Sequence, residues 1–231
     1  MDMKIDYDKI NPEEDMVLVD KPAGMSSFGV VGKIRWELSQ RVGLNEQGKK
    51  KKIKVGHTGT LDPFATGLLI ILIGKATKKS NEYLKKDKEY IANVRLGEVS
   101  DTGDIEGKIT TIETGKIPEK EETFNVVQSF VGEIEQRVPA YSAVKIDGKR
   151  AYELARKGKK VEMPKKKVHI YNIDVLEYEW PNLKIRCKVS SGTYIRQLGM
   201  DIGEKLGTGA YLTALRRISI DRYCVDDASM I

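Results

Sequence analysis

The chain has 231 residues, 40% of them hydrophobic, which is enough to bury the core of one large domain. Its 40 Lys and Arg residues outnumber its 34 Asp and Glu residues, so the formal net charge is +6. This charge favours an anionic partner such as nucleic acid without identifying one. The cysteines and histidines (Cys187, Cys224, His57 and His169) lack zinc-site spacing, and the longest apolar run is too short to cross a membrane. We therefore expect a cytoplasmic protein with no bound metal, no disulfide framework and no membrane association.

Hydrophobic patterns predict the first elements of the fold. Residues 16–19 form a short apolar run typical of a central strand, and the Lys21-Pro22-Ala23-Gly24 segment ends it. Ser26 or Ser27 can cap the helix that follows. Its predicted buried face consists of Phe28, Val31, Ile34 and Leu38.

The later elements alternate between strands and helices. The apolar run at residues 68–73 predicts a buried strand, and the alternation at 90–96 predicts a half-buried one. A helix is expected over residues 119–131, with Phe124, Val127 and Val131 at helical spacing. Residues 168–178 and 183–189 predict paired strands around a turn at 180–182. A last helix, residues 193–206, has Ile195, Leu198, Ile202 and Leu206 on its inner side and ends at Gly207.

Two segments are strongly basic. The first, residues 39–54, contains Lys49, Lys50, Lys51, Lys52 and Lys54. Such a run is either a solvated loop or a surface for RNA phosphates, and lysines alone do not distinguish the two. The second, residues 139–163, mixes lysines and arginines with Tyr141 and Tyr152, which suits neutralisation of a nucleic-acid backbone together with base stacking.

Residues 56–67, GHTGTLDPFATG, concentrate unusual chemistry in a short stretch. They contain one histidine, one aspartate, one proline, three glycines and three threonines. Asp62-Pro63 has an ordinary interpretation, because Asp is a favoured helix N-cap and Pro is favoured at the first helical position. The alternative is that Asp62 is a catalytic carboxylate.

This segment resembles the catalytic motif of the bacterial tRNA pseudouridine-55 synthases of the TruB type. The resemblance continues through VDKPAGMSS, GKATK, DKEY, RLGEVSDTGDIEG, PAYSAVKIDGKRAYELAR, SSGTYIRQLGMDIGEKLG and AYLTALRRISI, and covers roughly residues 16–220. It implies an α+β fold: a central mixed, largely antiparallel sheet flanked by helices, within a single catalytic domain spanning residues 1–231. Residues 139–163 resemble the thumb insertion that holds the tRNA arm, although Val138 replaces a proline common in the family.

The resemblance also implies roles for individual residues. Asp62 matches the catalytic aspartate, and Arg196 matches the arginine expected to keep it ionised. Tyr90 matches the tyrosine that stacks on the target uracil and is a candidate for removing the C5 proton. His57, Tyr194, Leu215 and Lys21 match positions that hold or border the uridine. The alternatives are a surface arginine for Arg196, a solvated lysine for Lys21, a structural residue for His57, and plain core packing for Tyr90, Tyr194 and Leu215.

The function implied is isomerisation of the T-loop uridine of tRNA to pseudouridine. The reaction is redox-neutral, so no cofactor is expected, and the expected partner of this monomer is the tRNA T stem-loop. The absence of a second carboxylate beside Asp62 fits isomerisation better than glycoside hydrolysis. The rival from another class is a noncatalytic RNA-binding or RNA-chaperone module. The family's usual C-terminal RNA-binding domain is expected to be absent, because the sequence ends at Ile231.

Overall fold

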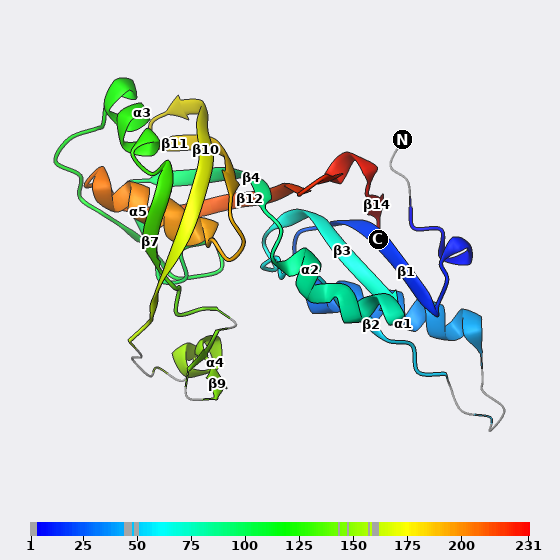
Figure 1. Ribbon diagram of the computed structural model, residues 1–231. Coiled ribbons are helices and arrows are strands. Elements are labelled where there is room, and N and C mark those ends of the chain that lie inside the picture. Colours follow the sequence, from blue (N-terminus) through cyan, green and yellow to red (C-terminus); the bar gives the residue numbers. More distant parts are fainter. Residues whose placement is uncertain are drawn as a thin grey trace. The chain divides into compact units, whose positions relative to one another are not determined.

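The computed structural model describes residues 4–43, 48, 51–142, 144–146, 148–156, 158 and 162–231 (Figure 1). The chain divides into two compact units: a terminal unit, Met1–Tyr90 with Arg216–Ile231, and a central unit, Ile91–Leu215. The division falls inside strands β4 (Lys88–Leu96) and β12 (Ala210–Ile220), which contribute residues to both units. The single catalytic domain stays a prediction. No helix among the described residues is long and apolar enough to cross a membrane.

The terminal unit contains two α-helices and several strands besides parts of β4 and β12. The helices are α1 (Ser27–Val42) and α2 (Ser80–Leu84); the strands are β1 (Glu14–Lys21), β2 (Val55–His57), β3 (Thr66–Gly74), β13 (Tyr223–Cys224) and β14 (Ser229–Met230). Short 3-10 helices occur at Tyr7–Lys9, Lys75–Lys79 and Val225–Asp227. Strand β1 contains the predicted strand at residues 16–19, which is thereby confirmed.

Strand β3 is the most buried element of the terminal unit, with seven of its nine residues inaccessible to solvent. It pairs antiparallel with β1 and β2 and parallel with β12. One face packs with α1 and the other packs with residues near the C-terminus; the first set is Leu69, Ile71 and Ile73, and the second is Leu68, Ile70 and Leu72. Because both faces are covered, the strand is continuously apolar instead of alternating. The buried strand predicted for residues 68–73 is confirmed.

Helix α1 begins where the sequence indicated. The Ser26 hydroxyl accepts a hydrogen bond from the Gly29 N–H at 3.0 Å and caps the helix. Val31, Ile34 and Leu38 are buried as predicted, but Phe28 is 69% exposed. Phe28 follows the buried Ser27 by one residue, which is about 100° around a helix, so its side chain lies off the buried stripe.

The central unit is built around strands from the middle of the chain. Its strands besides parts of β4 and β12 are β5 (Glu98–Ser100), β6 (Ile109–Thr111), β7 (Gly132–Arg137), β8 (Lys145–Ile146), β9 (Lys149–Arg150), β10 (Lys165–Glu179) and β11 (Asn182–Val189). Its helices are α3 (Lys120–Gln128), α4 (Ala151–Arg156) and α5 (Ile195–Lys205). The described part of the predicted thumb, residues 139–163, contains the β8–β9 hairpin and α4.

Among the described residues, the main sheet is mixed and has ten strands. Its hydrogen-bonded order is β14-β1-β3-β12-β4-β11-β10-β7, with β13 paired to β12 and β2 paired to β3. Strands β10 and β11 form the predicted antiparallel pair, while β1 with β14 and β3 with β12 are parallel. The predicted α+β class, with a mixed sheet flanked by helices, is confirmed.

The helices of the central unit lie close to the predicted ranges. Helix α5 buries Ile195, Leu198 and Ile202 and ends before Gly207, whose positive φ of 70° suits a helix stop. Helix α3 buries Val127, but Phe124 is 48% exposed and Val131, beyond the helix end, is 44% exposed. The prediction was wrong for these two, because the buried stripe of α3 is formed by Thr123 and Val127, one turn apart.

Lys88, on β4 in the terminal unit, is buried, with 7% of its surface exposed. Its ammonium group donates hydrogen bonds to the backbone carbonyls of Leu84, at 2.9 Å, and Lys86. Burial, and secondarily the positive charge of Arg217, lowers the pKa of Lys88 to about 8. The folded protein therefore holds this proton less tightly than the unfolded chain does.

We expect Lys88 to make the stability of the protein rise with pH. Between about pH 8 and the ordinary lysine pKa near 10.4, the unfolded state binds more protons at this site, so the free energy of unfolding increases with pH. Lys88→Met removes this dependence. From pH 7.5 to pH 10, wild type should gain on the order of 2 kcal/mol relative to Lys88→Met, measured by urea unfolding. The exposed Lys85→Met serves as the control, and parallel curves for wild type and Lys88→Met would contradict the expectation.

Candidate active site

Asp62 lies in a turn, not at the start of a helix. Residues 58–65, here named the Asp62 turn, connect β2 to β3, and the Ala65 N–H donates to the Asp62 carbonyl at 3.1 Å. The chain then enters β3 at Thr66. The helix-capping interpretation of Asp62-Pro63 is therefore wrong, because the residues after Pro63 continue into a strand. Asp62 itself is half-buried.

Both chain neighbours of Asp62 are fixed by the segment that joins β1 to α1. The Ser27 hydroxyl donates to the Leu61 carbonyl at 2.9 Å and accepts from the Leu61 N–H at 2.8 Å. The Pro63 carbonyl accepts from the Gly24 N–H at 2.8 Å and from Lys21 Nζ at 3.2 Å. These bonds, of which the two to Leu61 are buried, hold the backbone on each side of the carboxylate.

Lys21 is fully buried and supports the Asp62 turn through its hydrogen bond to Pro63. Besides Pro63, its ammonium group donates to the carbonyls of Pro22, at 2.8 Å, and Met25, at 2.7 Å. The alternative of a solvated lysine is therefore wrong. Its predicted place at the border of the uridine site stays a prediction.

Arg217, on β12, links the start of the Asp62 turn to strand β3. Its side chain is 1% exposed and donates to the Gly59 carbonyl at 3.1 Å and the Leu68 carbonyl at 2.7 Å. The backbone of Arg217 also passes so close to Gly67 that a Cβ there would lie 2.2 Å from the Arg217 carbonyl oxygen. Since Gly67 has a φ of 104°, only glycine fits this position.

His57 and Tyr90 lie on the strands beside the turn. His57 ends β2, and its Nδ1 accepts a hydrogen bond from the Gly59 N–H at 3.4 Å. Burial and the nearby Arg217 lower the pKa of His57, so its ring is neutral at pH 7. Tyr90 is 7% exposed and shares the buried face of β4 with Lys88. Both positions belong to the terminal unit, and the roles implied for them stay predictions.

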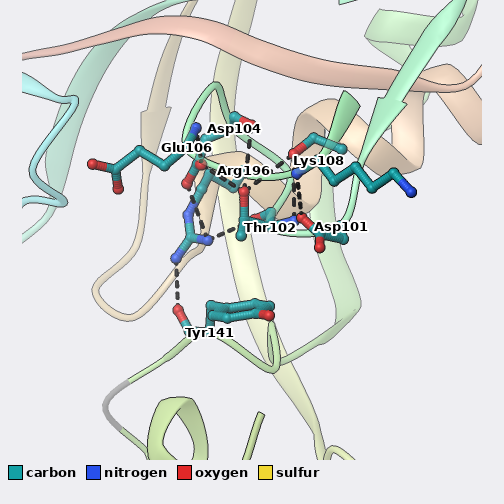
Figure 2. Close-up of polar contacts among 8 residues, drawn as sticks. Asp101, Thr102, Asp104, Glu106, Lys108, Tyr141 and Arg196 are labelled. Atoms are coloured by element: carbon teal, nitrogen blue, oxygen red, sulfur yellow. Dashed lines mark hydrogen bonds and ion pairs between the residues drawn. The ribbon is translucent and has the colours of Figure 1, made fainter. Parts of the chain in front are cut away.

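Arg196 forms a buried cluster in the central unit, shown in Figure 2. It is 5% exposed and lies 3.3 Å from the Asp104 carboxylate, and it donates hydrogen bonds to the carbonyls of Thr102, at 2.7 Å, and Tyr141, at 2.8 Å. Asp104 accepts further hydrogen bonds from the Thr102 hydroxyl, at 2.6 Å, and the Glu106 N–H, at 3.0 Å. The alternative of a surface arginine is therefore wrong.

Tyr194 and Leu215 also belong to the central unit. The backbone of Tyr194 exchanges two hydrogen bonds with the side chain of Gln136, at 2.8 and 3.0 Å, directly before α5 begins. Leu215 is 7% exposed at the end of the central part of β12. Asp62 lies in the terminal unit and Arg196 in the central unit, so the pairing expected between them stays a prediction.

Several residues of these clusters were not predicted from the sequence. No individual role was assigned to Asp104, Lys88 or Arg217, and Ser27 was considered only as a possible helix cap. The signal was present, because these residues lie within the matching blocks RLGEVSDTGDIEG, VDKPAGMSS, DKEY and AYLTALRRISI. The sequence pattern did not show that these residues are buried, because most of their contacts are with residues distant in the sequence.

Each unit also contains a hollow that is lined in part by basic residues, and the hollow of the central unit includes Asp101 and Glu162 as well. In the central unit a cavity of about 1040 Å³ includes Arg137, Tyr141, Lys145, Lys165 and Gln197 in its lining. In the terminal unit a pocket of about 360 Å³, here named the lysine pocket, is lined by Lys51, Lys52, Lys54, Lys75 and Lys78 together with Glu13 and smaller residues. The predicted basic loop thus contributes to a hollow, although Lys49 and Lys50 lie outside the described residues.

Comparison with known proteins places the chain among RNA-modifying enzymes. The sequence profile described as "TruB family pseudouridylate synthase (N terminal domain)" matches residues 47–195. A protein of Phocaeicola vulgatus named tRNA pseudouridine synthase B is 45% identical over 215 residues, covering 93% of this chain and 89% of that protein. One of the same name from Rhodopirellula baltica is 40% identical over 207 residues, covering 90% of this chain and 58% of the longer relative.

Comparison with solved structures gives the same result as the sequence comparison. A chain in the crystal structure of a Cbf5-Nop10-Gar1 complex matches all of this chain with a TM-score of 0.69 and 30% identity. A chain in an H/ACA RNP bound to a substrate RNA containing 2′-deoxyuridine matches 99% of it with a TM-score of 0.66 and 27% identity. In both cases this chain spans 56% of the matched chain. The protein therefore belongs to the TruB family of pseudouridylate synthases.

Proposed function

We propose that this protein isomerises the T-loop uridine at position 55 of tRNA to pseudouridine. The relatives named tRNA pseudouridine synthase B support tRNA as the substrate. The observation that carries the proposal is the Asp62 turn, in which Ser27 and Lys21 fix the backbone on both sides of a half-buried aspartate. A carboxylate held in this way is suited to act on a substrate carbon in a site with restricted access to water.

The reaction breaks the bond between ribose C1′ and uracil N1, turns the base, and forms a bond between C1′ and C5. The C5 hydrogen leaves as a proton and N1 gains one, so atoms and electrons balance without a cofactor. Asp62 would attack or stabilise the electron-poor carbon, and Arg196 would keep Asp62 ionised. Tyr90 would stack on the uracil and is the candidate for removing the C5 proton.

The remaining site residues would hold the uridine after it leaves the base stack. His57 is neutral at pH 7 because its pKa is lowered, so it suits hydrogen bonding and stacking better than charge pairing with a phosphate. Tyr194 and Leu215 would line the uracil pocket, and Lys21 would support its border. The T stem-loop would be held by the thumb segment, and the protein would act as a cytoplasmic monomer.

The first test replaces Asp62 by Asn, which preserves the size of the side chain and removes its negative charge. We expect no release of hydrogen from C5-labelled uridine in tRNA, while binding measured by gel shift is retained. A noncatalytic RNA-binding module would give no release with wild type either. Release by the Asn variant at the wild-type rate would refute the catalytic role of Asp62.

The second test addresses the carboxylate that accompanies Arg196. Asp104→Asn removes the carboxylate that lies 3.3 Å from the buried Arg196 guanidinium, and breaking a buried ion pair typically costs about 3–5 kcal/mol of stability. We expect lower stability in urea and a single-turnover rate reduced about tenfold or more. Asp101→Asn is the matched control, since Asp101 is exposed and its contact with the Lys108 N–H can be made by an amide oxygen. Equal behaviour of the two variants would argue against a role for the Arg196–Asp104 pair.

The third test addresses phosphate binding by the lysine pocket. Lys52, Lys54 and Lys75 are exposed, and their combined replacement by Gln should reduce the salt dependence of tRNA binding by roughly one unit of slope per lost contact. The turnover of bound tRNA should change much less. A control with Lys108, Lys120 and Lys188, exposed lysines of the central unit, should leave the slope unchanged. An unaltered slope in the first variant would identify the pocket as a solvated surface.

The thumb lysines Lys157, Lys159 and Lys160, also candidates for such contacts, lie outside the described residues.

A further inference from the structure

Two buried cations lie against the same glycine of the Asp62 turn. A Cβ placed on Gly59 would lie 3.7 Å from a guanidinium nitrogen of Arg217 and 3.9 Å from Cε of Lys88. Arg217 is 1% exposed and Lys88 is 7% exposed. Neither side chain is accessible enough to bind an RNA phosphate directly, so any effect on the reaction must pass through the turn.

Both cations are held by backbone carbonyls instead of by carboxylates. Arg217 donates to Gly59 and Leu68, and Lys88 donates to Leu84 and Lys86. Among the described residues, neither cation has a carboxylate within ion-pair distance. Burying a cation without an ionic partner is costly, and a neutral hydrogen-bond donor could hold the same carbonyls. The positive charge itself therefore calls for an explanation.

The Asp62 turn contains a single acidic side chain. Asp62 follows Gly59 by three residues, which an extended chain spans in at most about 11 Å. Across a partly buried region, charges at this separation interact appreciably, because the effective dielectric constant is lower than that of water. Among the described residues of the terminal unit, the contacts place Lys21 from the end of β1, Lys88 from β4 and Arg217 from β12 beside the turn, with the neutral His57 on β2. Asp87 adds a negative charge near Lys88.

We propose that Lys88 and Arg217 are positioning residues for Asp62: Arg217 ties the start of its turn to strand β3, and both cations favour its ionised form. This inference rests on the proposed function, since it assigns the aspartate a role that requires negative charge. It adds two residues to that site that do not touch the substrate. The two contributions can be separated, because Lys88 makes no hydrogen bond to the turn whereas Arg217 donates to Gly59 in the turn and to Leu68 in β3.

The charge contribution is tested with Lys88→Gln, which retains an N–H donor for the Leu84 and Lys86 carbonyls and loses the positive charge. We expect kcat for C5-hydrogen release from tRNA to fall about five- to tenfold with KM unchanged. The acidic limb of the kcat–pH profile should move to higher pH by about half a unit or more, because Asp62 becomes harder to ionise. Lys85→Gln, an exposed lysine three residues away, should match wild type.

The geometric contribution is tested with Arg217→Lys, which retains the charge but cannot reproduce both guanidinium bonds. We expect a lower kcat with no displacement of the acidic limb. Wild-type kcat and an unmoved acidic limb in Lys88→Gln would overturn the charge contribution, and wild-type kcat in Arg217→Lys would overturn the geometric one. If Lys88→Gln does not fold, Lys88→Met provides the same comparison of kcat and pH profile. A failure of the proposed function is distinct from these outcomes, because wild type would then release no C5 hydrogen.

Discussion

The attachment of the Asp62 turn to the β1–α1 junction is the interaction on which the candidate site depends. Two reciprocal hydrogen bonds join Ser27 to Leu61, and the Pro63 carbonyl receives donors from Gly24 and Lys21. The junction is itself fixed, because β1 pairs with β3 along its whole length and α1 packs on one face of β3. A turn is ordinarily more mobile than the elements it joins. Here a buried polar network gives it the rigidity that a reacting carboxylate requires.

The two units hold their buried cations in different ways. In the central unit, Arg196 is matched by the Asp104 carboxylate, so the cluster is close to neutral and its geometry is fixed by charge pairing. In the terminal unit, Lys21, Lys88 and Arg217 donate hydrogen bonds to backbone carbonyl dipoles, which stabilise a cation without cancelling its charge. Positive potential consequently remains near the turn. That potential suits both an ionised aspartate and a polyanionic RNA substrate.

Regular elements were predictable from the sequence because their signal is local. The apolar run of β3 and the periodic pattern of helix α5 predict these elements directly. Phe28 and Phe124 were wrongly placed in the core, because a shift of one position along a helix moves a side chain by about 100° around its axis. Burial of charged residues was not predictable from pattern. Lys21 is buried because Pro63 brings it a distant carbonyl, and Arg196 because the loop carrying Thr102 and Asp104 folds over it. Only the family resemblance drew attention to these positions, and it did so without indicating their partners.

Within the terminal unit, strand β3 separates the Asp62 turn, where the reaction is proposed to occur, from the lysine pocket, which is proposed to attract RNA. The Asp62 turn precedes its first residue, Thr66, and the lysine pocket surrounds its last, Gly74. Nine residues at about 3.3 Å per residue place these ends roughly 26 Å apart, well beyond the screening length at physiological salt. Charges in the pocket therefore have little influence on the ionisation of Asp62 and can affect only how RNA is attracted and held. The buried cations next to Gly59 lie within that screening distance of the turn and are shielded from salt, so within the terminal unit they, and not the pocket lysines, can influence the carboxylate.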